Sequence, residues 1–522
     1  MRGKFHRPQN QPETIEYTEK GLPKLCCKTQ RNLESPLFQA FFSTYVPEKA
    51  FSVCIKDSVF IDPACKSGVF LREIAKRLLK GLEPLYPDLQ ERTDHIFKHQ
   101  LYGIAITELT SHLSRRSLYC SKFANGKYSV VHFDNIDGNV RFKNVKHRWL
   151  NGKCVFCGAS QKEYDRADDL ETHAYEMIHT TKPEGIFNMK FDVIIGNPPY
   201  QLNTVSGETT NVSKQAKPIY NLFVEQAKKL NPRFLCMIIP SRWFAGGLGL
   251  DNFRQTMMED EHITHLVDYT NAKDCFPQNS ISGGVCYFLR ERDTTGLCEF
   301  TNINGNKTTT ESRSLSEFPV VVRYNSAVDI IRKVREKAAS FLKDEVSPIS
   351  PFAIPTKVTG EPKPTARCNI TLYTSRGVGY INKSEILSNI KYLDKYKVMV
   401  SQIGAEHAGE PGRDGKFRVL TSSMRVMEPN EVCTNSYIVI GEYTDPVIAN
   451  NVLAYLKTKF VRFLVLQAVS SIHISRTSFT FVPMVDFSRQ WGDEELYGEF
   501  GITPDEVEFI DSMIKPMDGG DE

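Results

Sequence analysis

Between Ser58 and Leu289, short apolar runs alternate with amphipathic stretches, and this alternation constrains the fold more than any other feature of the chain. The apolar runs predict strands over 59–62, 101–106, 127–134, 191–196, 234–240, 263–269 and 283–289. Helical patterns occupy 69–82, 108–124 and 216–232. Strands that alternate with helices form a parallel sheet covered on both faces, so we expect a doubly wound α/β domain.

Two interruptions of this rhythm predict the domain organisation. Residues 143–186 are too long for an ordinary connection and carry their own cysteine and histidine pairs. After about Arg292 the alternation ends. We therefore expect an N-terminal segment at 1–57, the sheet-bearing domain at 58–295 with its insertion, and a mixed α+β domain at 296–522.

Composition excludes several classes of protein. The 522 residues include 65 Lys plus Arg against 62 Asp plus Glu, and this net charge of +3 excludes a polybasic protein. No apolar run is long enough for a membrane-spanning helix, and the N-terminus lacks the apolar region of a secretory signal. We therefore expect no membrane partner. Because the 13 cysteines are scattered, we also expect a reducing, cytoplasmic location.

The segment that follows the strand at 191–196 is the most informative one for chemistry. Asn197-Pro198-Pro199-Tyr200 stands where a parallel strand delivers residues to the ligand-binding edge of the sheet. Two prolines fix the backbone and leave rigid carbonyls. The Asn197 amide oxygen and the Pro198 carbonyl can accept hydrogen bonds from an amine on a ring and so free its lone pair. Tyr200 offers a flat face for a planar base. The alternative is a proline-terminated strand and turn.

Over about residues 58–292, the order of motifs resembles the adenine-N6 DNA methyltransferases of restriction–modification systems, in the gamma arrangement. The resemblance implies a Rossmann-like fold, S-adenosylmethionine as cofactor, and methyl transfer to N6 of an adenine flipped out of double-stranded DNA. It makes 58–295 the catalytic domain and 296–522 the target-recognition domain. A separate restriction endonuclease or helicase-type subunit is the implied partner for cleavage.

The cofactor motif of this family reads D-P-A-C-G-S-G-x-F-L, and residues 62–71 match it with Lys66 in place of the first glycine. The resemblance assigns cofactor binding to Asp62, Pro63, Ala64 and Gly68. Lys66 either reshapes the turn, where a non-glycine at positive φ costs about 1 kcal/mol, or places a cation near the cofactor carboxylate. The alternative is a purely structural strand–helix turn.

Three further residues are candidates by position. The family's ribose-binding acid aligns with Ala105, so Glu108 is the candidate substitute, or else a first-turn helix acid. Asp134 follows the predicted third strand and matches the position that contacts the cofactor adenine, or else is a turn aspartate. Phe276 precedes a proline and is the candidate for stacking on the second face of the base, or else a buried loop residue.

The insertion carries a zinc-like pattern. Cys154 and Cys157 form a C-x-x-C knuckle, and His173 and His179 follow. This spacing predicts a closed, structural zinc site with those four ligands. The alternative is a reduced C-x-x-C pair with two surface histidines.

Basic residues cluster at 143–148, 391–397 and 413–418, where they either contact phosphates or form solvated faces. The stretch 451–467 predicts one amphipathic helix that packs in a core, and 502–514 predicts another helix. No pattern for base readout is visible.

Three functions remain open from the sequence. The first is an active adenine-N6 DNA methyltransferase, and the second is an enzyme of the same chemistry that acts on RNA or a protein amide. The third is a non-catalytic DNA-recognition subunit with weakened cofactor binding, because Lys66 and Ala105 depart from the family pattern. The segment before the cofactor motif is too short for a nuclease domain of normal size.

Overall fold

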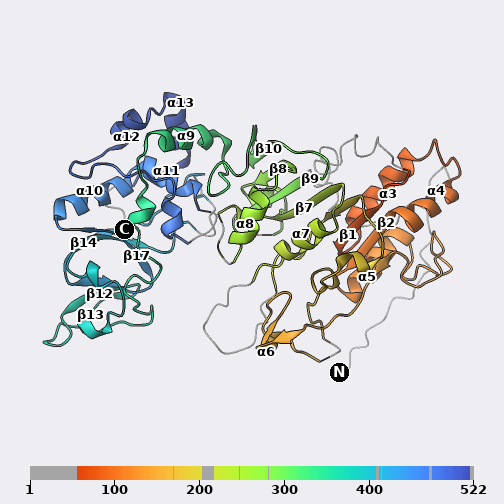
Figure 1. Ribbon diagram of the computed structural model, residues 1–522, viewed down its shortest axis with the longest axis horizontal. Coiled ribbons are helices and arrows are strands. Elements are labelled where there is room, and N and C mark those ends of the chain that lie inside the picture. Colours follow the sequence, from red (N-terminus) through yellow and green to blue (C-terminus); the bar gives the residue numbers. More distant parts are fainter. Residues whose placement is uncertain are drawn as a thin grey trace, which may run out of the picture. The chain divides into compact units, whose positions relative to one another are not determined.

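The computed structural model (Figure 1) describes residues 56–167, 170–202, 217–245, 247, 249–279, 281–406, 411–412, 414–469 and 473–517. The chain divides into two compact units, Met1–Met237 and Ile238–Glu522, and the division falls within strand β7 (Phe234–Pro240). Of the predicted N-terminal segment at 1–57, only Lys56 and Asp57 are among the described residues.

The first unit is built on a parallel sheet. Its strand order is β7-β6-β1-β2-β3, and every neighbouring pair runs parallel. The bounds are β1 (Phe60–Cys65), β2 (Leu101–Ala105), β3 (Val140–Arg141) and β6 (Val193–Gly196). All residues of β1 and β6 are buried, as expected for strands covered on both faces. The structure therefore confirms a mixed α/β fold with a large parallel sheet.

Three helices follow the strands at the predicted places, and a fourth was not predicted. The predicted helices are α3 (Val69–Gly81), α5 (Glu108–Tyr119) and α7 (Tyr220–Lys229), and the additional one is α4 (Leu89–His95). A five-residue π-helical turn, Ile96–Gln100, continues α4 into β2. Leu71, Ile74 and Leu78 recur at helical spacing in α3 and are buried. Helix α5 ends five residues earlier than predicted because Cys120 adopts a left-handed conformation, with φ of 58°.

The third strand predicted over 127–134 is wrong. The backbone N–H of Val130 bonds to the Tyr119 carbonyl at 3.0 Å, and that of Phe133 bonds to the Ala124 carbonyl at 3.3 Å. This segment is therefore held by the end of α5 and the loop after it. The third strand is instead β3, which pairs with Gly103 and Ile104 of β2.

The insertion between β3 and β6 has little regular structure. Strands β4 (Trp149–Leu150) and β5 (Lys153–Cys154) form an antiparallel hairpin, and one short helix follows, α6 (Gln161–Tyr164). Two 3₁₀ turns, Glu176–Ile178 and Pro183–Ile186, lead towards β6. The connection is long because it folds into a small unit of its own.

The second unit begins with a mixed sheet whose strand order is β11-β10-β8-β9. The elements are α8 (Asp251–Met258), β8 (Ile263–Tyr269), β9 (Val285–Glu291), β10 (Cys298–Asn304) and β11 (Lys307–Arg313). Strand β8 runs parallel to β10 and antiparallel to β9. The strands predicted at 263–269 and 283–289 are confirmed, and residues 298–313 continue the same sheet past the predicted boundary at 295.

The remainder of the second unit mixes helices with two three-stranded sheets, ordered β13-β12-β16 and β15-β14-β17 (Figure 1). The strands are β12 (Ile370–Thr374), β13 (Gly377–Ile381), β14 (Tyr396–Ser401), β15 (Arg425–Met427), β16 (Glu431–Cys433) and β17 (Tyr437–Tyr443). The helices are α9 (Val328–Lys337), α10 (Pro446–Lys457), α11 (Lys459–Gln467), α12 (Asp493–Phe500) and α13 (Pro504–Met513).

The helix predicted over 451–467 is two helices. Thr458 leaves the helical conformation between α10 and α11, and its hydroxyl accepts a hydrogen bond from the Val461 N–H at 3.3 Å, which caps α11. Tyr455, Phe460 and Phe463 are fully buried in the largest core of this unit. The prediction that this stretch packs in a core is therefore confirmed, whereas its continuity is not.

Within the described ranges, no helix has the length and apolar character needed to cross a membrane. The described cysteines form no disulfide.

Candidate active site

The predicted cofactor motif begins inside β1. Asp62 is 2% exposed, and its Oδ1 accepts a hydrogen bond from the Ala64 N–H at 3.0 Å. Burial raises the pKa of Asp62 to about 7, although the Ala64 N–H and the charge of Lys66 act to lower it. Pro63 and Ala64 are also buried, so this part of the motif is packed inside the protein near the carboxyl end of β1.

The turn from β1 to α3 depends on Gly68. Gly68 has φ of 71°, and a Cβ at this position would lie 3.1 Å from the Ser114 Cα of α5. Lys66 is not among the described residues with positive φ, so the strain expected from a non-glycine there does not arise. The Ser114 hydroxyl donates to the Lys66 carbonyl at 3.1 Å, which ties the turn to α5. The residue that must be glycine is therefore Gly68.

Replacing Gly68 with alanine is expected to lower the free energy of unfolding by about 1–2 kcal/mol, because a left-handed alanine is strained and its Cβ has no room. Cofactor affinity should fall as well, because the turn must shift. Gly185→Ala is the matched control, since a Cβ there meets no atom within 4 Å and φ is not in the left-handed range. Urea unfolding measures the change in stability, and calorimetry measures the change in cofactor affinity. Equal stability and equal cofactor affinity in the two variants would contradict the requirement for glycine at position 68.

The Asn197–Tyr200 segment lies directly beside this motif. Strand β6 pairs in parallel with β1, with Phe60 opposite Val193 and Ile61 opposite Ile194. At the end of β6, a Cβ on Gly196 would lie 3.0 Å from Asp62 Oδ1 and 3.3 Å from Pro63 Cδ. The two motifs predicted from the sequence are thus brought into contact, because glycine lets the two strand ends approach.

The Asn197 side chain presents an unused acceptor. Its Oδ1 is buried and has no hydrogen-bond partner among the described residues. A buried amide oxygen without a partner costs about 1–3 kcal/mol, so such an atom is typical of a functional site. Pro198 is buried and supplies no backbone donor of its own.

The segment is held on its other side by the approach to α7. The Ile219 N–H donates to the Tyr200 carbonyl at 3.1 Å, and the Leu202 N–H donates to the Lys217 carbonyl at 3.0 Å. Tyr200 is half-buried. The four residues Asn197–Tyr200 are therefore fixed between β6 and α7, which preorganises the Asn197 oxygen.

Strand β2 contains no acidic residue of its own. Ala105 is the last residue of the strand, and Glu108 is an exposed first-turn residue of α5. Thr107 caps this helix, because its hydroxyl accepts a hydrogen bond from the Thr110 N–H at 3.1 Å. The ribose-binding role of Glu108 stays a prediction.

Asp134 is exposed and lies in the loop before β3. It therefore does not stand at the carboxyl end of a strand, and the positional argument for its contact with the cofactor adenine is lost. Its role stays a prediction without that support. The residues that follow β3 are Phe142 and Lys143.

Phe276 belongs to the second unit. It is half-buried in the loop between the 3₁₀ turn Ala272–Asp274 and β9, and its N–H donates to the Ala272 carbonyl at 2.7 Å. Its role in base stacking stays a prediction.

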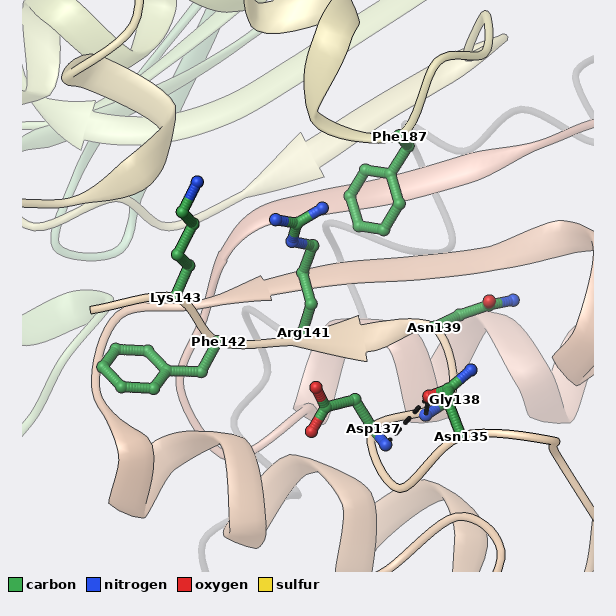
Figure 2. Close-up of a pocket in the computed structure, with 8 residues that line it drawn as sticks. All are labelled: Asn135, Asp137, Gly138, Asn139, Arg141, Phe142, Lys143 and Phe187. Atoms are coloured by element: carbon green, nitrogen blue, oxygen red, sulfur yellow. Dashed lines mark hydrogen bonds between the residues drawn. The ribbon is translucent and has the colours of Figure 1, made fainter. Parts of the chain in front are cut away.

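A polar hollow of about 360 Å³ flanks the edge strand β3 (Figure 2). Arg141 and Lys143 lie on the same side of the strand as Phe187, and the Arg141 guanidinium lies 5.5 Å from the centre of the Phe187 ring. Asn135 Oδ1 accepts hydrogen bonds from the backbone N–H groups of Asp137 and Gly138 at the other end. The hollow contains none of the site residues predicted from the sequence.

The insertion gathers four metal-binding side chains, but not the four predicted. The potential ligand atoms of His147, Cys154, Cys157 and His179 all lie within 4.8 Å of one another. His173 lies outside this group, and its Nδ1 is 3.3 Å from the Tyr175 hydroxyl and 3.2 Å from a Glu171 carboxylate oxygen. The prediction of His173 as a ligand is therefore wrong.

His147 takes the place of His173 because chain folding, not order along the chain, brings ligands together. It stands seven residues before Cys154, within the basic cluster 143–148, for which the sequence predicts phosphate contact or a solvated face. The position of His147 shortly before the C-x-x-C pair was the sequence signal that could have identified it as a metal ligand.

The basic cluster at 391–397 is only partly a solvated face. Lys391 is exposed and pairs with Glu442 at 2.9 Å. Lys397 is fully buried in β14, where its ammonium donates to the Lys395 and Glu428 carbonyls at 2.9 and 2.8 Å. Lys397 therefore stabilises the fold and does not offer its charge to a phosphate. Arg413 of the third cluster lies outside the described residues.

Comparison with known proteins gives evidence that does not depend on the geometry of the site. Residues 99–276 match the family model of the Eco57I restriction-modification methylases. An uncharacterized adenine-specific methylase of Mycoplasma pneumoniae is 37% identical over 265 residues, which are 46% of this chain and 62% of that protein. The chain thus spans less than two thirds of the curated relative it matches.

Solved structures are similar at lower identity. The type IIL restriction-modification enzyme MmeI, solved in complex with DNA, is 12% identical, with 86% of this chain and 66% of that one covered and a TM-score of 0.46. A nuclease-deletion mutant of the type ISP enzyme LlaGI, in complex with a DNA substrate mimic, is 11% identical, with 90% and 45% covered and a TM-score of 0.46. The segment 99–276, which contains Asn197–Tyr200, is thus similar in sequence to the Eco57I restriction-modification methylases.

Proposed function

We infer that the protein transfers a methyl group from S-adenosylmethionine to N6 of adenine in double-stranded DNA. The observation that carries this inference is the buried Asn197 Oδ1, which has no hydrogen-bond partner in the part of the chain that the structure describes and is held beside the Asp62 motif by the close approach at Gly196. The match of 99–276 to a methylase family and the adenine-specific relative support it.

The chain's own residues act on the amine. Asn197 Oδ1 and the Pro198 carbonyl accept hydrogen bonds from the two N6 protons, so that the nitrogen becomes pyramidal and its lone pair is free to attack. The cofactor supplies an electrophilic methyl group on its sulfonium. N6 would take this methyl group in a single displacement in which the C–S bond breaks as the N–C bond forms, the extra N6 proton would pass to solvent, and no covalent bond to the enzyme would be made. Tyr200 stacks on one face of the flipped base, and we assign the other face to Phe276.

The residues at the end of β1 fit the cofactor. Asp62 is a buried acceptor, and Gly68 and Gly196 let the turn approach α5 and the end of β6 approach Asp62, because a Cβ at either position would meet these protein atoms at 3.1 and 3.0 Å. We assign cofactor binding in a Rossmann-like arrangement to Asp62, Pro63, Ala64 and Gly68, with Glu108 and Asp134 as further candidates. The unstrained Lys66 supports an active enzyme over a subunit that has lost cofactor affinity.

The same proposal assigns a function to the C-terminal region. We assign target recognition to residues 296–522 and cleavage to a separate restriction endonuclease or helicase-type subunit of a restriction–modification system. Readout of a specific DNA sequence would come from side chains in that region.

The test is adenine-methylation sequencing of plasmid DNA from cells that express the chain, paired with calorimetry of the purified protein and S-adenosylmethionine. We expect N6-methyladenine at one recurring sequence and saturable cofactor binding. Cofactor binding with methylated RNA or protein amide in place of DNA would replace the substrate part of the proposal. No cofactor binding at millimolar concentration would overturn the enzymatic function and leave a DNA-recognition subunit.

Asp62 makes stability depend on pH in a defined direction. Burial raises its pKa in the folded chain to about 7, from an ordinary 3.8, so the folded state holds the proton more tightly than the unfolded state. This contribution to stability is complete below about pH 4 and is lost as the pH rises to 7.

Without cofactor, the free energy of unfolding of the wild type should therefore fall relative to Asp62→Asn as the pH rises from 5 to 7. The expected slope of the difference is at most about 1.4 kcal/mol per pH unit. Urea titrations at several pH values measure it, and parallel curves for the two proteins would contradict the buried state of Asp62.

A further inference from the structure

The four side chains gathered in the insertion have their potential ligand atoms within 4.8 Å of one another, and two of the separations fit a tetrahedral metal site. The Cys157 Sγ lies 3.5 Å from His147 Nδ1, and His179 Nε2 lies 3.2 Å from the same Nδ1. With Zn–S of about 2.3 Å and Zn–N of about 2.0–2.1 Å, the edges of a zinc tetrahedron are about 3.6 Å from sulfur to nitrogen and about 3.3 Å between nitrogens. Both observed distances match these edges.

The outer hydrogen bonds of both histidines leave the inner nitrogens free for a metal. His147 Nε2 lies 2.7 Å from the Thr172 carbonyl, and His179 Nδ1 lies 2.8 Å from the Tyr175 carbonyl. Because a carbonyl only accepts, each of these outer nitrogens carries the N–H of its ring. The inner nitrogens of neutral rings then face each other with lone pairs, an arrangement that a cation between them stabilises.

The cysteine pair is folded as a metal-binding knuckle. The Gly158 N–H donates to the Cys154 carbonyl at 2.8 Å, and the Cys154 N–H donates to the Ala159 carbonyl at 2.9 Å, so the chain turns tightly around both thiols. Gly158 has φ of 67°, which glycine adopts without strain. His147, Cys154 and Cys157 are buried, and His179 is 9% exposed, so the site is closed to solvent.

We propose that His147, Cys154, Cys157 and His179 bind one structural zinc ion. Two thiolates and two imidazoles in a tetrahedron are the donor set that zinc prefers, and four protein ligands leave no position for a reacting water. The assignment concerns folding of the insertion and is independent of the proposed methylation.

The site fastens the insertion to the element that follows Asn197–Tyr200. Gln226 of α7 donates from its amide to the carbonyls of Met177 and Thr180, at 3.1 and 2.6 Å, on either side of His179. The Tyr175 ring lies 5.9 Å from the Phe223 ring of the same helix. A metal bound through His179 therefore stabilises the turn against which α7 packs.

His147 and His173, two of the three histidines of the insertion, provide a matched test. The full chain, purified without chelator, is expected to contain about one zinc per molecule by elemental analysis. His147→Ala and Cys154→Ser should each lower the zinc content at least about tenfold, whereas His173→Ala should keep it. A folded wild type without zinc would overturn the proposal, and so would loss of zinc in His173→Ala with retention in His147→Ala.

A second measurement serves if a ligand variant fails to fold. Removing the metal from the wild-type chain with a chelator should lower its unfolding temperature by roughly 5–10 °C, and adding zinc alone should restore it. Limited proteolysis should then cut first within 143–186. Replacement by Co²⁺ should give the spectrum of a tetrahedral site with two thiolates. Octahedral Co²⁺ bands, or a chelator without effect on the unfolding temperature, would each overturn the assignment.

Discussion

Replacing Asn197 with alanine is expected to lower kcat for the proposed methylation by about 10²- to 10³-fold, with little change in cofactor affinity. The reason is geometric. Asn197 Oδ1 is buried without a partner among the described residues, so its acceptor is held ready for the amine and engages it as the nitrogen becomes pyramidal. An interaction that strengthens only in the transition state raises kcat and leaves ground-state binding almost unchanged.

Single-turnover kinetics and calorimetry on the same preparation separate the two effects. Asn252→Ala is the matched control, because Asn252 is an exposed residue of α8. This control should methylate like the wild type. Near-normal turnover in Asn197→Ala would remove the catalytic role, and a loss of cofactor binding of the same size as the loss of kcat would make Asn197 a structural residue.

The largest effect on stability is expected from Arg323. Its guanidinium forms a two-pronged ion pair with Asp268 of β8, at 2.6 Å from Nε to Oδ2 and at 2.8 Å from Nη2 to Oδ1. The Asp268 side chain is fully buried, and the Ser241 hydroxyl also donates to Oδ1 at 2.6 Å. Arg323→Met should lower the free energy of unfolding by about 3–5 kcal/mol, because it leaves a buried carboxylate without its counter-charge.

A double variant shows whether the buried charge is the cause. In Arg323→Met combined with Asp268→Leu, neither charge remains, so the loss of stability should be smaller than in Arg323→Met alone. Arg332→Met is the contrasting control: Arg332 contacts Glu317 and Asp329 but is 43% exposed, and its loss should cost at most about 1 kcal/mol. Denaturant unfolding measures all three variants. Equal losses for Arg323→Met and Arg332→Met would contradict this ranking.

The strand predictions succeeded where an apolar run had no competing contact. Strands β6, β7 and β8 lie where their sequences predict them, because their residues are apolar enough to be buried on both faces. Residues 127–134 have an equally strand-like pattern, yet their backbone bonds to the end of α5. The preference for a strand is local, whereas the hydrogen bonds that replaced it are tertiary.

The candidate site also has features that the sequence predicts and features that only the tertiary structure shows. That Asp62 and Asn197 stand at the ends of strands was predictable, because parallel strands bring their carboxyl ends to one edge of the sheet. That the Asn197 oxygen is buried with no partner within the described ranges, and that Gly196 lies against the Asp62 carboxylate, was not predictable. Both facts depend on the distance between two strand ends about 130 residues apart.

The sequence by itself therefore determined the α/β class, the two motifs and the presence of a metal-binding pattern, because these follow from periodicity and residue type. Only the tertiary structure decided which histidine joins Cys154 and Cys157, since ligands are selected by where their side chains meet. It placed His147 in the cluster and left His173 beside Tyr175. It also decided that Lys66 is tolerated while Gly68 is required, because backbone conformation and the approach of α5 are properties of the folded chain.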